Sequence, residues 1–200
     1  MKARTRIAFG VLLTAASTAA LVVTGGTYGY RLNLTDSAPS GIWRVLQRTK
    51  AVTHGDIVSV CPPNTAIVVA VRDAGLIASD MGPLQWGSKG CSSKTVPLLK
   101  PVVATAGDLV SVTRHGVSVN GRVLRNSASA DLVLGMPATP EGTYQVQPGQ
   151  LWVISSYSPQ SFDSRYFGPV SENAVRGFAH AVAVRGSEAS IFSDAGEHTW

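Results

Sequence analysis

Residues 109–124, LVSVTRHGVSVNGRVL, carry the clearest structural signal in the sequence. Apolar and polar residues alternate around two turn-forming pairs, His115-Gly116 and Asn120-Gly121. An Asn-Gly pair between alternating apolar residues predicts a β-hairpin, because both residues tolerate the positive φ angles of a tight turn. The stretch therefore predicts a three-stranded antiparallel meander. Its strands are expected at residues 109–113, 117–119 and 122–124.

The sequence on both sides of this meander also contains short β-forming runs separated by turns. Helical periodicity is weak there, apart from a turn or two expected near residues 73–80. We therefore predict a mainly β fold with an antiparallel sheet. Further strands are expected at residues 42–47, 56–60, 66–72, 98–104, 151–155 and 179–184.

The N-terminal region predicts a membrane helix. No charged residue occurs between Arg6 and Arg31, and no proline occurs before Pro39. A helix across this gap would be about 36 Å long, enough to span a hydrocarbon core with some tilt. Basic residues before the gap, Lys2 and Arg4 among them, favour a cytoplasmic N-terminus.

These patterns divide the chain into a cytoplasmic tail at 1–6, one transmembrane anchor at 7–30 and a domain at 31–185. The expected location is the inner membrane, with the domain in the periplasm. Turn-rich residues 62–97 and 125–149 are interpreted as a cap insertion and a small second lobe, and polar residues 186–200 as a loose tail. A cleavable signal peptide is the alternative to the anchor, since the apolar run is rich in Ala, Thr and Gly. We favour the anchor because the run exceeds a usual signal-peptide h-region.

The amino-acid composition limits the kinds of molecule that this chain is expected to bind. The 200 residues are 44% hydrophobic and 14% charged, which suits one domain with a buried core. The net charge of +5 includes no dense Lys/Arg run. A nucleic-acid partner is therefore not expected, whereas the N-terminal basic residues suit anionic lipid headgroups of a bilayer.

Cys61 and Cys91 both lie in the predicted exported region. An oxidising compartment favours a structural disulfide between them, which would contribute roughly 3–4 kcal/mol by restricting the unfolded chain. The alternative is a Cys–His nucleophile, but none of the four histidines has a recognisable partner motif. The spacing fits no zinc site, so neither a metal nor a cofactor is expected.

Ser37 and Lys100 are the candidate chemical groups. Ser37 lies between the predicted anchor and the first strand, where Pro39 and Gly41 restrict the backbone, although the same composition is ordinary for a turn. Lys100 interrupts an apolar run, and burial could leave its amine neutral and able to accept a serine proton. The alternative is an edge-strand lysine whose stem covers apolar surface.

A third polar segment follows residue 160. Asp163 and Arg165 could form a buried ion pair that fixes a loop, which we take as their main role. Ser161 could hydrogen-bond the lysine nitrogen and orient it.

Together these segments resemble, in order, the signature boxes of type I signal peptidases. The four matching stretches are NLTDSAPSGIW at 33–43, GDIVSV at 55–60, LLKPVVATAGD at 98–108 and SFDSRYFGPV at 161–170. Within this family the chain most resembles the conjugative-transfer signal peptidases of the TraF type, to which Cys61-Pro62-Pro63 and Ser161-Phe162-Asp163 are also similar. The chain departs from the housekeeping enzymes at Ala38, at Pro101 and at residues 155–159, SSYSP.

The resemblance implies a serine endopeptidase with Ser37 as nucleophile and Lys100 as general base. The Ser37 N–H, helped by the Thr35 hydroxyl, would stabilise the oxyanion; Asp163 would be functionally important and Ser161 would orient the lysine. The implied substrate is a membrane-inserted precursor, most specifically a conjugative pilin precursor with small residues at −1 and −3. A monomer is expected.

Two other functions remain open at this point. The first is a general type I signal peptidase. The second is a non-catalytic bitopic assembly protein of a transfer apparatus, in which the boxes serve only as scaffold.

Overall fold

The structure is a computed structural model that describes residues 3–35, 37–80, 90–129, 132–133 and 135–185. The predicted tail at 186–200 and part of the predicted cap lie outside these residues. The helices are α1 (Ala3–Thr27), α2 (Ala66–Asp73) and α3 (Ser164–Phe167), with a 3₁₀ turn, η2, at Glu172–Ala174.

The described part of the chain is mainly β, as predicted. An antiparallel sheet has the strand order β1-β2-β13-β3-β4-β11-β12, a smaller sheet has the order β10-β5-β6-β7, and β8 pairs with β9. Strands of the larger sheet are β1 (Tyr30–Asn33), β2 (Gly41–Leu46), β3 (Ile57–Val60), β4 (Leu98–Ala104), β11 (Gln150–Val153), β12 (Val170–Ser171) and β13 (Val175–Val184). The others are β5 (Leu109–Thr113), β6 (Gly116–Val119), β7 (Arg122–Val123), β8 (Leu132–Val133), β9 (Met136–Pro137) and β10 (Gly142–Gln145).

The predicted meander is confirmed as β5, β6 and β7. Asn120 and Gly121 have φ angles of 52° and 81°, which is the positive-φ pair that a tight hairpin turn requires. The Asn120 side chain also accepts a hydrogen bond of 2.9 Å from the Leu109 N–H and so joins this turn to the start of β5. β10, which the sequence pattern did not predict, adds a fourth strand on the other side of β5.

The prediction of a strand at residues 66–72 is wrong, because this segment forms α2. Its buried residues are Ile67, Val68 and Val71, a spacing that places them on one face of a helix. That face packs in a core with Tyr166 and Phe167 of α3. Tertiary burial thus overrides the β propensity of Ile and Val. The helical turns expected at 73–80 are also wrong, because α2 ends at Asp73.

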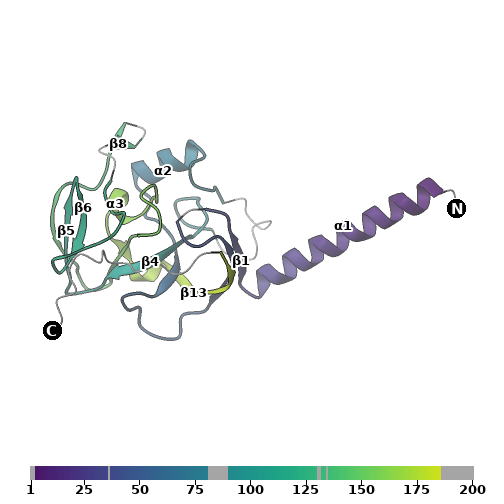
Figure 1. The fold of residues 1–200 in the computed structure, drawn as a ribbon, viewed down its shortest axis with the longest axis horizontal. Helices are drawn as coiled ribbons and strands as arrows, with labels where there is room; N and C mark the ends of the chain where they lie inside the picture. The colour runs from purple at the N-terminus through teal and green to yellow at the C-terminus, as the bar shows by residue number, and fades with distance from the viewer. Residues whose placement is uncertain (1–2, 36, 81–89, 130–131, 134, 186–200) are drawn as a thin grey trace.

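α1 is the apolar N-terminal helix. Its segment Ile7–Thr27 contains an 18-residue window with a mean hydropathy of 2.1, and none of that window is buried, so by length and composition the segment could cross a membrane. Figure 1 shows α1 standing clear of the β-rich part of the molecule.

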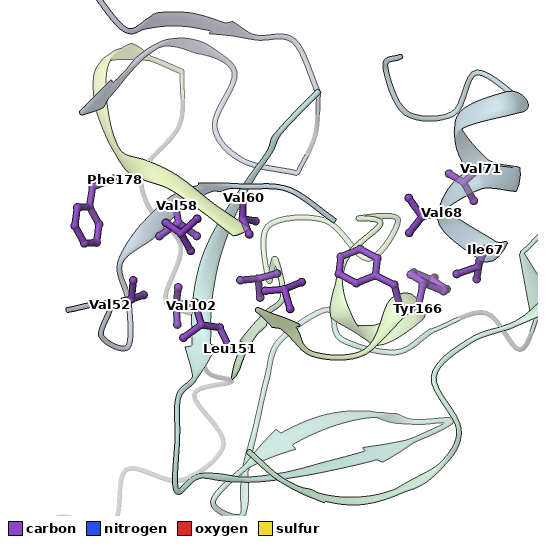
Figure 2. Packing of buried hydrophobic residues seen from close by; sticks show 14 residues of the cluster. Val52, Val58, Val60, Ile67, Val68, Val71, Val102, Leu151, Tyr166 and Phe178 are labelled. Atoms are coloured by element: carbon purple, nitrogen blue, oxygen red, sulfur yellow. The ribbon is translucent and has the colours of Figure 1, made fainter. Parts of the chain in front are cut away.

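Buried residues on both sides of β4 hold this strand in the interior. Figure 2 shows Val102 of β4 among Val58, Val60 and Leu151, with the α2 side chains beyond Tyr166. The next residue, Val103, belongs instead to a second core that also contains residues of β5 and β6. A lysine on β4 therefore has little access to water.

Candidate active site

A cavity of about 1100 Å³ extends from the end of α1 to β4. Its walls come from several parts of the chain, among them segments as far apart in sequence as the end of α1, β4 and the residues before α3. Gly26 and Thr27 lie at the α1 end, and Ser37, Lys100 and Ser161 also line the cavity. The structure therefore brings the predicted nucleophile, base and lysine-orienting serine to one cavity.

Ser37 lies in the loop between β1 and β2, and it is half-buried. Asn33 organises this loop from inside: its amide donates to the carbonyl oxygens of Ala38 at 2.9 Å and Pro39 at 3.2 Å. The buried Trp43 indole N–H donates to the same Pro39 oxygen at 2.9 Å. These bonds fix the backbone that presents Ser37.

Lys100 is only 2% exposed, and its Nζ donates to Ser161 Oγ at 2.6 Å. Burial lowers the pKa of Lys100 to about 8; attraction by the Asp163 carboxylate opposes this and repulsion by Arg165 adds to it. Among the described residues, no carboxylate lies within ion-pair distance of this amine. A lysine held in this way can lose its proton in the range where enzymes operate.

Asp163 and Arg165 form the ion pair that the sequence predicted, and both side chains are fully buried. Arg165 Nε lies 2.8 Å from Asp163 Oδ1, and Nη2 lies 3.0 Å from Oδ2. The remaining Arg165 hydrogens reach backbone carbonyl groups, including those of Asn126 at 2.7 Å and Ser155 at 2.7 Å. Asp163 also accepts from the Ser155 N–H at 3.0 Å. In the described residues, these bonds of Asp163 go to neither Ser37 nor Lys100, which fits a positioning role.

Thr35 lines the cavity, but its hydroxyl is already engaged. Thr35 Oγ1 donates to Asn33 Oδ1 at 2.7 Å, so the proton that would reach an oxyanion points into the loop. Thr35 can assist there only after its hydroxyl rotates.

Cys61 and Cys91 form a disulfide with a Cα–Cα distance of 5.4 Å. The Arg176 side chain, which lines the cavity, donates to Cys61 Sγ at 3.3 Å. The disulfide therefore lies next to the cavity wall. No cluster of His, Cys, Asp and Glu that could hold a metal ion occurs within the described segments.

The sequence of the whole β-rich part matches a known family. The model for signal peptidases, described as peptidase S26, covers residues 3–184. The chain belongs to the peptidase S26 family. This S26 peptidase is 37% identical over 164 residues to a conjugal transfer protein TraF of Agrobacterium tumefaciens, covering 82% of this chain and 87% of the relative. A plasmid transfer protein TraF of Escherichia coli is 32% identical over 176 residues, covering 86% and 92%. A signal peptidase I of Enterococcus faecalis aligns over 66% of this chain and 98% of its own, at 19% identity and a TM-score of 0.36.

Sequence reasoning missed two polar residues of the S26 peptidase site, Asn33 and Ser155. Asn33 stands two residues before Thr35, a spacing typical of a side chain that caps its own turn. Ser155 donates through Oγ to the Ser37 carbonyl oxygen at 2.5 Å. The only sequence feature that pointed to Ser155 was its position in residues 155–159, the stretch that differs from the housekeeping signal peptidases.

Proposed function

We propose that this S26 peptidase is a membrane-anchored serine endopeptidase that removes leader segments from membrane-inserted precursors. Ser37 acts as the nucleophile and Lys100 as the general base. The observation that carries the proposal is the Lys100 amine: it is buried, bonded to the Ser161 hydroxyl, and lines the same cavity as Ser37.

The proposed reaction begins with a neutral Lys100 amine. Such an amine keeps N–H bonds to donate to Ser161 and has a lone pair free to accept the Ser37 proton. Ser37 Oγ then attacks the scissile carbonyl carbon, and the Ser37 N–H stabilises the oxyanion. The protonated Lys100 gives its proton to the departing amine, and water hydrolyses the resulting acyl-enzyme.

The cavity supports cleavage close to a bilayer. The end of α1 and the two residues after it, from Gly26 to Gly29, line the same cavity as Ser37 and Lys100. If α1 spans the inner membrane with its N-terminus in the cytoplasm, the cavity opens where a precursor leaves the lipid on the periplasmic side. Tethering then raises the effective concentration of a co-embedded substrate.

The named relatives support a substrate from a conjugation apparatus, because those proteins are called conjugal or plasmid transfer proteins. We therefore propose a pilin precursor as the substrate, with small residues at −1 and −3. The general signal peptidase and the non-catalytic assembly protein are the functions against which this proposal is tested.

The test is cleavage of candidate precursors in proteoliposomes that contain the full chain, with the products identified by mass spectrometry. We expect a pilin precursor to be cut at one site, and a secretory precursor to be cut much more slowly. Ser37→Ala should abolish cleavage, whereas Ser40→Ala, in the same loop, should not. Equal rates on both precursors would favour a general signal peptidase, and cleavage by Ser37→Ala would overturn the mechanism.

A further inference from the structure

Ser155 is a buried polar residue whose hydrogen bonds link the Asp163–Arg165 ion pair to the loop that carries Ser37. It lies two residues after the end of β11 and is 1% exposed. Its N–H donates to Asp163 Oδ2 at 3.0 Å, and its carbonyl oxygen accepts from Arg165 Nη2 at 2.7 Å. The backbone of Ser155 is therefore fixed by both members of the buried ion pair.

The Ser155 side chain extends this fixed unit to the nucleophile loop. Ser155 Oγ donates to the Ser37 carbonyl oxygen at 2.5 Å and accepts from the Tyr157 N–H at 3.2 Å. Among the hydrogen bonds of the described residues, this is the one that reaches Ser37 itself from another element. The bonds from Asn33 and Trp43 hold neighbouring positions of the loop instead.

The same segment also holds the base. Ser161, six positions after Ser155, accepts the hydrogen bond from Lys100 Nζ. Between these two serines, the Pro159 carbonyl oxygen accepts from Arg165 Nη1 at 3.1 Å. One segment, pinned by Arg165, thus contacts both the nucleophile loop and the base.

We propose that Ser155 is a positioning residue that sets the location of Ser37 relative to Lys100. This inference rests on the proposed function. Loss of the hydroxyl leaves the Asp163–Arg165 pair and the Lys100–Ser161 bond in place but releases the Ser37 backbone from them. Because a nucleophile displaced by about 1 Å can cost about 100-fold in rate, the effect should exceed that of an ordinary hydrogen bond.

The test compares Ser155→Ala with Ser155→Thr, which keeps a hydroxyl, and with Ser156→Ala, a matched control at an adjacent buried serine. For Ser155→Ala we expect kcat to fall by about 10- to 100-fold, with KM within about twofold of the wild-type value. The inflection of the pH profile should not move, because the contacts of Lys100 are unchanged. Ser155→Thr should recover most of the rate.

Hydrogen exchange supplies a readout that does not depend on activity. In Ser155→Ala, the amides of Ser37, Ala38 and Ser40 should exchange faster, while those of β4 should stay protected. If Ser155→Ala lowers the folded fraction, the cleavage rate of Ser155→Thr provides the test. Recovery of most of the wild-type rate supports the inference, and a rate as low as that of Ser155→Ala overturns it. Wild-type kcat in Ser155→Ala would also overturn it, and if Ser37→Ala is inactive in the same assay the proposed function stands.

Discussion

Lys100 and Arg165 are two cations buried in neighbouring parts of the molecule, and their surroundings differ. Arg165 is surrounded by a carboxylate, that of Asp163, and by several backbone carbonyl groups from other segments. β4 gives Lys100 only apolar neighbours along its strand, and the amine reaches a neutral hydroxyl. Both cations are therefore buried, and their partners distinguish them. The guanidinium that is paired with a carboxylate holds a loop, whereas the amine without a paired carboxylate can titrate.

The largest expected effect is on activity. Replacing Lys100 with Met should lower the cleavage rate by about 10,000-fold, because the general base is lost. Lys100→Arg should be equally inactive, since a guanidinium does not deprotonate in proteins. The measurement is the rate of precursor cleavage in proteoliposomes, with Lys94→Met, at an exposed lysine, as the control. Activity in Lys100→Arg would break the contrast between the two cations.

The next effect concerns stability at the paired cation. Asp163→Ala leaves Arg165 charged and buried without its carboxylate, which should lower the free energy of unfolding by about 3–5 kcal/mol. Asp73→Ala is the matched control, because Asp73 pairs with Arg72 but is 62% exposed. Its loss should cost about 1 kcal/mol or less. Urea unfolding of the wild type and the two variants measures both losses of stability. Equal losses in Asp163→Ala and Asp73→Ala would contradict the assignment of a buried, structural ion pair to Asp163 and Arg165.

A smaller and opposite effect is expected at Lys100. The pKa falls from 10.5 to about 8 on folding, which corresponds to roughly 3 kcal/mol of destabilisation when the amine is charged. Lys100→Met removes this cost but leaves Ser161 without its partner, at about 1 kcal/mol. At pH 7 the variant should therefore be about 2 kcal/mol more stable than the wild type.

The pH dependence of the stability difference between Lys100→Met and the wild type provides a control for this prediction. Between pH 8 and 10.5 the unfolded chain binds more protons at Lys100 than the folded chain, so wild-type stability rises with pH. The advantage of Lys100→Met should shrink across this window. A variant that is less stable than the wild type at pH 7 would show that the amine is not desolvated.

Local sequence was enough to predict the parts of the fold and site that depend on near neighbours. The Asn120-Gly121 turn is one such part, since its φ angles follow from residue type. Asp163 lies two residues from Arg165, so their pairing is also local. The apolar neighbours of Lys100 allowed burial but equally allowed an edge-strand lysine, and the structure decides for burial.

The missed features depend on contacts between distant segments. α2 forms where Ile67 and Val68 reach a core shared with α3, which residue propensity does not encode. The Ser155–Ser37 bond joins residues 118 positions apart. Neither the composition around Ser155 nor that around Ser37 contains information on this pairing.

The last prediction tests the titration of Lys100 in the working enzyme. If the neutral amine is the base, kcat/KM should follow its neutral fraction, which is about one tenth at pH 7 and about nine tenths at pH 9 for a pKa of about 8. The rate should therefore rise by about tenfold over this range and then level off. The measurement is kcat/KM in proteoliposomes between pH 6 and pH 10, with integrity of the protein checked at each pH. A flat profile over this range would mean that Lys100 is not the base.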